Sequence, residues 1–299
     1  MAHNLQERYS QLTDVKLRAS LVTKDHVVFN TRYDGNPVAG AVKVPVRDAE
    51  VTVEDYSKTG GTNLTHGSTI YLNIPISNDK AVNELIDGYD AAGVPDNLVA
   101  DRIDSAGYSL GLTLDTAGVA LLAGADTAVY AATDPRYGKK AAAHTLGADE
   151  SIFDACVDAR ASMTKVYVPA TGRYVLASPD FYSKILKDKD NFVKKGDLSQ
   201  KLVETGAVGE IAGFAVYETP NLPAGVLAVF GHPDYATRID EYKVPVHVQD
   251  LSGSGKYIGA CAVQGRMVYE HCVTKPQAFY ILKTAKDSSG ESQSAGNQE

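Results

Sequence analysis

Residues 95–125 read PDNLVADRIDSAGYSLGLTLDTAGVALLAGA, and this stretch decides the fold. Apolar residues recur through it at spacings of three and four, which places them on one face of an α-helix. Pro95 and Asp96 form a start signal for that helix. The sequence therefore predicts one unusually long helix, about 26 residues or close to 40 Å at about 1.5 Å per residue. Its apolar stripe consists of Val99, Ile103, Ala106, Leu110, Leu114, Ala117 and Leu121.

A pair of long strands is predicted before the helix. Apolar and polar residues alternate at residues 42–46 and again at 70–76, as in half-buried strands. The apolar phase shifts by one residue after Arg47-Asp48, which predicts a β-bulge or bend. Residues 57–67 between the strands are nearly all polar and too many for a tight turn. At about 3.3 Å per residue, residues 42–53 would reach roughly 40 Å, so we expect this hairpin to pack on another subunit.

The remaining elements are predicted from shorter patterns. Residues 1–41 are polar with weak periodicity, and we expect an extended arm that is ordered only by partners. Asn78-Asp79 is a capping signal for a short helix through about Tyr89. The tail after Lys286 is low in complexity, and we expect it to be disordered. In the second half the predicted helices cover residues 152–163 and 179–186, and the predicted strands cover 173–177, 211–217, 226–230, 244–248, 257–262, 266–270 and 278–282.

Composition and charge fit a folded protein without bulk affinity for nucleic acid. Of the 299 residues, 44% are hydrophobic and 22% are charged, and the net charge is -8. There is no run of 18 apolar residues and no apolar leader, and 3 cysteines are too few for a disulfide scaffold. We therefore expect folding in a reducing cytosol.

The charge is concentrated in the middle of the chain. Residues 51–150 hold 6 basic and 14 acidic side chains, a local charge of -8. The simplest interpretation is a solvated helix face, and the alternative is a surface that repels DNA. The acids concerned are Asp79, Glu84, Asp87, Asp90, Asp96, Asp101, Asp104 and Asp115.

Several patterns resemble functional motifs, and each departs from what its chemistry needs. Gly107-Tyr108-Ser109-Leu110-Gly111 matches the G-x-S-x-G nucleophile elbow, but that elbow requires a strand-to-helix turn and this stretch lies inside the predicted helix. No catalytic, cofactor-binding or metal-ligating residue is therefore predicted, and no cofactor. The loop at residues 253–257 resembles a phosphate loop but lacks its first glycine and its Ser or Thr, and Cys261, His271 and Cys272 lack the second ligand pair of a zinc site. Asp188 and Asp190 match the start of a calcium loop, but the glycine of that loop is missing. Asn63 begins a glycosylation sequon, but the sequence has no apolar leader.

Three parts of the chain together resemble one known family. Residues 56–72 resemble its extended loop, residues 78–125 its spine-helix region, and residues 173–179 with 209–223 its axial domain. The family is the major capsid proteins of tailed double-stranded DNA bacteriophages, with the Hong Kong ninety-seven-type fold. The likeness covers roughly residues 40–285 and rests on loose patterns rather than on a fixed signature.

The resemblance implies a structural, non-enzymatic subunit with an α+β phage capsid fold. Copies would assemble as hexamers and pentamers of an icosahedral shell around double-stranded DNA, without sequence-specific DNA binding and without a membrane. It implies assembly in the bacterial host cytoplasm and a final place in the virion capsid. The implied parts are an N-terminal arm (1–41), an extended hairpin loop (42–77), a peripheral domain with the spine helix (78–129), an axial domain (130–255), returning peripheral strands (256–286) and a disordered tail (287–299).

The resemblance also implies partners. Because the first strand follows Met1 by only about 40 residues, we expect a separate scaffolding protein rather than a fused scaffolding segment, together with a portal and a decoration protein. The hairpin would lie across a neighbouring copy. Its expected intersubunit contacts are Tyr56, Lys58, Thr62, Asn63, Thr65 and Tyr71.

Other readings remain open at this point. An encapsulin-type nanocompartment shell protein shares the fold and would hold protein cargo instead of DNA. A phage tail or sheath subunit would form tubes. An enzyme of a different class, a serine hydrolase, would use Ser109.

Overall fold

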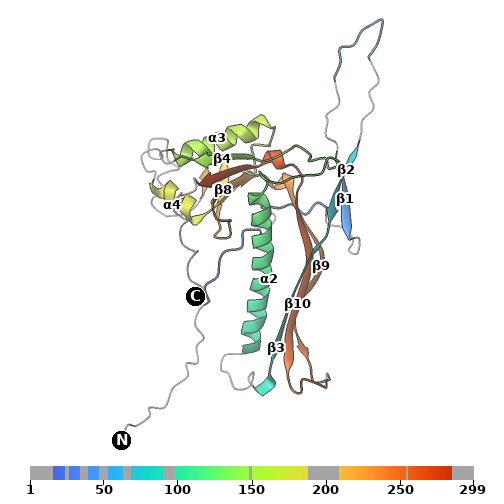
Figure 1. Cartoon of the computed structure of the whole chain (residues 1–299), viewed down its shortest axis with the longest axis vertical. Coiled ribbons are helices and arrows are strands. Elements are labelled where there is room, and N and C mark those ends of the chain that lie inside the picture. Colours follow the sequence, from blue (N-terminus) through green and yellow to red (C-terminus); the bar gives the residue numbers. More distant parts are fainter. Residues whose placement is uncertain are drawn as a thin grey trace, which may run out of the picture.

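The computed structural model describes residues 16–23, 27–33, 40–46, 53–62, 69–89, 98–147, 150–187, 209–253 and 255–284. One long helix, α2, runs beside three long strands (Figure 1). A larger sheet with helices α3 and α4 lies at one end of this helix. The two-stranded hairpin of β1 and β2 lies on the side of the three long strands that faces away from α2. This mixture of helices and sheets confirms the predicted α+β class.

Helix α2, Leu98–Ala123, confirms the helix predicted from the apolar stripe. Its C-terminal turns, with Val119 and Leu122 fully buried, enter the main hydrophobic core. Its N-terminal half packs on the three-stranded sheet, where Ala106 meets Ile86 and Val263. By length and composition alone α2 could also cross a membrane. In this fold, however, one face covers a sheet and its last turns are built into the core.

The three-stranded sheet that α2 covers is antiparallel, in the order β3-β10-β9. The helix predicted at Asn78 through about Tyr89 is wrong, because residues 78–86 form strand β3 instead. Backbone pairing of Asn78 with Tyr269 and of Ile86 with Cys261 fixes this strand against β10. The bounds are β3 Asn78–Ile86, β9 Ala236–Asp250 and β10 Cys261–Val273.

The larger sheet has the order β4-β11-β8-β5-β7-β6 and carries most of the core. Phe181, Phe214 and Phe230 are fully buried and meet edge to face. The cap predicted at Ser178 is confirmed, since its Oγ accepts a hydrogen bond from the amide of Phe181 (3.1 Å) at the start of α4. The bounds are β4 Ala142–Leu146, α3 Ile152–Lys165, β5 Tyr174–Ala177, α4 Pro179–Lys187, β6 Glu210–Ile211, β7 Phe214–Glu218, β8 Val226–Gly231 and β11 Tyr280–Thr284, with short 3-10 turns η1 Pro233–Tyr235 and η2 Pro276–Ala278.

The hairpin consists of β1, Ala41–Val46, paired antiparallel with β2, Ile70–Pro75. Val44, Leu72 and Ile74 form a small separate core with Ile239 and Cys272, so the base of the hairpin is fixed to the ends of β9 and β10. The phase shift predicted at residues 47–48 lies outside the described residues. The observed base therefore supports a projecting element on a firm attachment.

Candidate functional site

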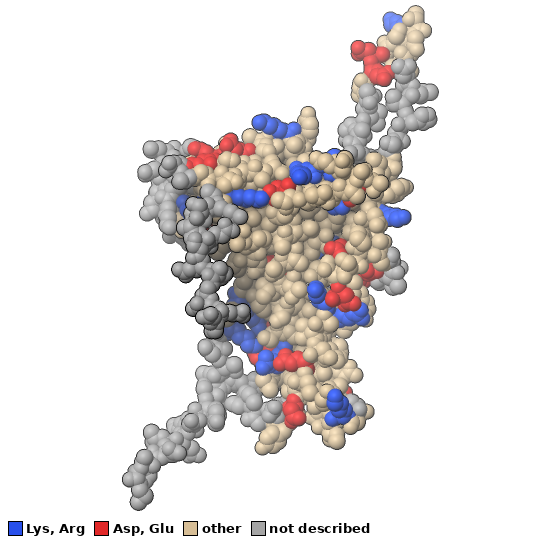
Figure 2. All heavy atoms as spheres, viewed as in Figure 1, with Lys and Arg blue, Asp and Glu red and all other residues tan. Residues whose placement is uncertain are grey.

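The described tip of the hairpin, residues 53–62, is exposed at every position. It ends in a turn in which Gly61 donates its amide to the Ser57 carbonyl (2.8 Å), and Gly61 has a φ of 69°, which glycine adopts without strain. Figure 2 places this tip away from the body, with acidic and basic side chains together on it. Val53 is 93% exposed and Tyr56 is 75% exposed. Large apolar side chains held so far from the core are typical of a surface that meets another molecule.

The predicted intersubunit residues fall in two places on the hairpin. Tyr56, Lys58 and Thr62 lie in the exposed tip, and Tyr71 lies on β2 opposite Pro45 with 61% of its surface exposed. Asn63 and Thr65 lie outside the described residues. The single chain contains no neighbour that would test these contacts, and they stay predictions.

The N-terminal segment, residues 16–33, behaves differently from the tip. The expectation that it is ordered only by partners is wrong for residues 16–23 and 27–33, because they pack on their own chain. Val28 and Phe29 are fully buried in the main core. The amide of Ala19 donates to the Tyr108 hydroxyl (2.8 Å), and Lys16 pairs with Asp101 (2.7 Å). Contacts with α2 thus fix the course of this segment.

Asp115 is the centre of that attachment. It lies on α2 and is fully buried. Its Oδ1 accepts hydrogen bonds from the Thr23 amide (2.8 Å) and the Thr23 hydroxyl (2.9 Å), and its Oδ2 accepts one from Asn221 Nδ2 (2.7 Å). Arg238 on β9 then donates to the Thr23 carbonyl (2.8 Å). One carboxylate therefore joins the N-terminal segment, the long helix and the loop between β7 and β8 of the larger sheet.

The burial of Asp115 corrects its assignment to a solvated acidic face. The residue sits next to Leu114 of the apolar stripe, so its position on the helix offered a signal that it borders the core. The nearby acids Asp101 and Asp104 do lie at the surface, in ion pairs with Lys16 and Arg18. The hydrogen bond from Arg18 lowers the pKa of Asp104.

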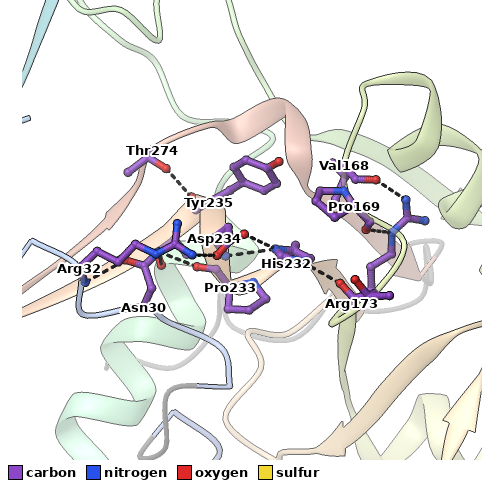
Figure 3. A network of polar contacts seen from close by, with 12 residues as sticks. Asn30, Arg32, Val168, Pro169, Arg173, His232, Pro233, Asp234, Tyr235 and Thr274 are labelled. Carbon is purple, nitrogen blue, oxygen red and sulfur yellow. Dashed lines mark hydrogen bonds and ion pairs between the residues drawn. The ribbon is translucent and has the colours of Figure 1, made fainter. Parts of the chain in front are cut away.

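The chain crosses from β8 to β9 at a second polar junction, shown in Figure 3. Asn30 donates through Nδ2 to the carbonyls of Pro233 (2.7 Å) and Ala236 (2.9 Å), and Arg32 pairs with Asp234. His232 bridges the corner, because its Nε2 bonds to the Thr171 carbonyl (2.9 Å) while its Nδ1 accepts from the Asp234 amide (3.2 Å). This junction holds the two sheets and the N-terminal segment in one arrangement.

His271 lies at the centre of the packed interface among the N-terminal segment, α2 and β9. Its ring is 4.8 Å from the Phe29 ring, and within the described part of the chain its buried Nε2 has no hydrogen-bond partner. Burial, with a smaller contribution from the charge of Arg238, lowers the pKa of His271 to about 4. The imidazole is therefore neutral near pH 7 and acts as a core side chain.

The motifs weighed for chemistry do not form reactive sites in the described residues. Ser109 lies within α2 and donates to the Ser105 carbonyl one turn earlier (2.9 Å), so it lacks the strand-to-helix turn of a nucleophile elbow. Cys261, His271 and Cys272 all lie on β10, and no group of three metal-binding side chains occurs among the described positions. Burial raises the pKa of Cys272 to about 11, which makes its thiol inert. Asp188, Asp190 and Ser254 lie outside the described residues.

A family model described as "Phage capsid protein" matches residues 76–282. Among curated proteins, the major capsid protein of Escherichia phage T7 is 35% identical over 91 residues, which cover 29% of this chain and 25% of that protein. The minor capsid protein of the same phage matches over the same length at 35% identity. The matched region thus spans about a quarter of the length of these curated relatives.

Solved structures resemble nearly the whole chain. A structure from Mycobacterium phage Che8 aligns with a TM-score of 0.69 at 20% identity, over 93% of this chain and 96% of that one. The capsid structure of cyanophage P-SCSP1u aligns with a TM-score of 0.72 at 15% identity, over 94% and 93%. The mature capsid of bacteriophage PhiM1 aligns with a TM-score of 0.69 at 15% identity, over 94% and 92%. At these identities the likeness establishes the fold.

Proposed function

This chain belongs to the phage capsid protein family, and we propose that its copies assemble as hexamers and pentamers of an icosahedral shell around double-stranded DNA. The observation that carries the proposal is the exposed hairpin tip on a firmly attached base, in a fold shared with phage capsid structures. Family and fold indicate a structural role rather than an enzymatic one. We place the subunit in the virion capsid after assembly in the host cytoplasm.

We propose that the hairpin crosses to a neighbouring copy through Tyr56, Lys58, Thr62, Asn63, Thr65 and Tyr71. Tyr56 and Tyr71 support this, because each presents most of a large aromatic ring to solvent. Tyrosine is favoured at protein interfaces since its ring buries apolar area while its hydroxyl keeps a polar partner. The net charge of -8 suits a container that packages DNA without binding it in a sequence-specific way.

We also propose a division of the subunit into a peripheral and an axial part. A peripheral part made of α2 with β3, β9 and β10 is supported because the three strands form one sheet and α2 shares a small core with it. It supports an axial part built on the six-stranded sheet, with α3 and α4. Relative to the boundaries expected from sequence, β9 joins the peripheral part and β11 joins the axial part.

Electron microscopy of the expressed full chain tests the proposal. We propose that a separate scaffolding protein assists assembly, and closed, uniform particles are expected when it is coexpressed. A monodisperse monomer that persists under assembly conditions would refute it, and tubes would favour a tail or sheath subunit. Nuclease-protected DNA in particles from infected cells would separate a capsid from a nanocompartment, which would contain protein cargo. Uniform shells from this chain alone would count against the proposed separate scaffolding protein.

The hairpin contact has its own test. Tyr71→Ser should lower the yield of particles by about tenfold, because it removes an aromatic side chain that the proposed contact would bury. Tyr137→Ser is a matched control, since Tyr137 is 62% exposed but lies on the loop after α2. Equal yields from the two variants would refute a special role for Tyr71.

A further inference from the structure

A cavity of about 610 Å³ lies between residues 18–23 of the N-terminal segment, α2 and the strands β9 and β10, and we call it the spine groove. Figure 1 shows α2 running beside these strands. The helical side of the groove extends from Ile103 to Leu114, roughly 16 Å at 1.5 Å per residue. Its floor includes Leu110, Leu114 and Met267, all half-buried. A cavity of this size with an apolar lining is typical of a small-molecule site.

Gly107 leaves a gap in the floor of the groove. It is the first glycine of the G-x-S-x-G pattern, which forms no reactive site here. At Gly111 a methyl group would lie 2.8 Å from Leu21, so close packing accounts for that glycine, but at Gly107 a methyl group would meet nothing within 4 Å. Glycine weakens the interior of a helix, and packing within the described chain does not account for Gly107. Room for another molecule in the groove does.

The lining of the groove is basic in a protein with a net charge of -8. Four basic side chains face two acidic ones, Asp104 and Asp240, and Arg18 and Arg238 pair with those two acids. Arg238 is buried, yet its Nε makes no hydrogen bond within the described part of the chain. Lys243, on the same strand, is exposed and has no ion-pair partner among the described residues. The β9 side of the groove therefore attracts an anionic group.

We infer that the spine groove binds a single-chain anionic amphiphile, such as the carboxylate of a fatty acid. Its alkyl chain lies on Leu110 and Leu114 and fills the gap beside Gly107, and its carboxylate faces Lys243. A polyanion such as DNA does not fit, because the apolar floor offers no partner to phosphates. The bound molecule contacts the N-terminal segment, α2 and β9 together, so it strengthens the attachment of residues 18–23. This binding site goes beyond the proposed shell function and does not depend on it.

Calorimetric titration of the unassembled full chain tests the chemistry of the ligand. Octanoate, decanoate and laurate are compared below their micelle concentrations. The affinity should rise about fifteenfold with each added pair of methylenes, because burial of one methylene gives about a fourfold gain. Lys243→Met should weaken the binding of decanoate about fivefold and leave that of decanol unchanged, since only decanoate carries a charge.

A second variant tests the place of the ligand. In Gly107→Leu the new side chain fills the gap, and leucine favours a helix more than glycine does, so the variant should still fold. Its affinity for laurate should be at least about tenfold lower than that of wild type. The matched control is Ser109→Leu, at an exposed position of the same helix outside the groove, which should bind laurate like wild type. Laurate should slow amide hydrogen exchange in residues 18–23 at least about fivefold in wild type and in Ser109→Leu, and much less in Gly107→Leu.

Each outcome decides one part of the inference. Equal laurate affinity in wild type and Gly107→Leu, or unchanged exchange of residues 18–23, would overturn the groove as the site. A Lys243→Met variant that weakens decanoate and decanol equally, or neither of them, would overturn the anionic head group. Affinity that does not depend on chain length would overturn the alkyl chain. All these measurements use the unassembled chain and leave the shell function standing, whereas absence of wild-type particles would refute the shell function alone.

Discussion

The attachment of the N-terminal segment should depend on Asp115 far more than on the neighbouring surface ion pairs. Asp115→Asn keeps the shape of the side chain but replaces one acceptor oxygen by an NH2 group. In the wild type both carboxylate oxygens accept hydrogen bonds, one from the Thr23 amide (2.8 Å) and one from Asn221 Nδ2 (2.7 Å). In the variant the new NH2 group must therefore face one of these donors. The variant therefore leaves at least one buried donor without an acceptor.

The magnitude follows from these contacts. Each hydrogen bond to a charged group contributes about 1.5–3 kcal/mol, and a buried donor left unpaired costs about 1–3 kcal/mol. Part of this loss is offset, because the variant no longer buries a charge. We expect a net loss of about 3 kcal/mol in the free energy of unfolding, or a shift of about 1 M in the urea midpoint at an m-value of about 3 kcal/mol/M.

The assay is urea unfolding of the unassembled subunit, with amide hydrogen exchange as a local readout. The Thr23 amide should exchange faster in Asp115→Asn, since its acceptor is weakened. The control is Asp101→Asn on the same helix, which removes an ion pair that is about one-third exposed and should cost less than about 1 kcal/mol. If the two variants lose the same stability, or if Thr23 exchange is unchanged, the buried carboxylate is not the anchor.

Two further predictions concern the same interface. Since the pKa of His271 falls from 6.5 to about 4 on folding, its neutral form stabilises the fold above pH 6.5, and this stability is lost as the pH falls toward 4. Relative to His271→Leu, wild type should lose up to about 3 kcal/mol of unfolding free energy over that window, and parallel pH profiles of the two proteins would contradict this. Gly118→Ala places a methyl group 2.9 Å from the buried Phe29 ring and 3.1 Å from His271 Nε2, so unfolding should become easier by about 1–3 kcal/mol. Gly107→Ala on the same helix meets nothing within 4 Å and should be neutral or stabilising by up to about 1 kcal/mol, measured by the same unfolding curves. A similar response at both glycines would argue against close packing at Gly118.

The long helix could be predicted from sequence because its signal is local. The apolar stripe from Val99 to Leu121 repeats at helical spacing within one continuous segment, and α2 ends within a few residues of the predicted bounds. The same is true of the helix around Cys156 and of the cap at Ser178. In each case the residues that determine the element are also the residues that form it.

Strand β3 could not be predicted because its partner is far away in the chain. Asn78-Asp79 can cap a helix, and Ala81, Leu85 and Ile86 fit one face of it. The structure instead pairs this segment with β10, from Ile86 with Cys261 to Asn78 with Tyr269, so the paired residues are 175 to 191 positions apart. Cross-strand contacts such as the ion pair of Arg266 with Asp79 (2.5 Å) stabilise that register. Strand propensity depends on such neighbours, so tertiary pairing overrode a weak local helix signal.

The buried polar residues of the attachment were missed for a related reason. Asp115, Thr23, Asn221 and Arg238 come from four separate segments, and each alone reads as a surface residue. Only the fold brings them together. A carboxylate adjoining an apolar stripe was the one signal available in the sequence, and it indicates a border of the core rather than a particular partner.

The N-terminal segment and the hairpin tip differ in how much they depend on a neighbouring subunit. A segment does not require another molecule when its apolar side chains are buried and its polar groups are paired, and residues 16–23 and 27–33 meet much of this condition through Phe29, Asn30 and Thr23. The tip pairs some of its polar groups in its own turn but does not bury its large apolar side chains, since Val53 and Tyr56 are exposed to water. Burial of apolar area is the main gain available to such side chains, and the chain's own core is out of their reach. Assembly should therefore change the environment of the tip more than that of the N-terminal segment, and the buried attachment explains how an exposed arm can be held in position before a neighbour arrives.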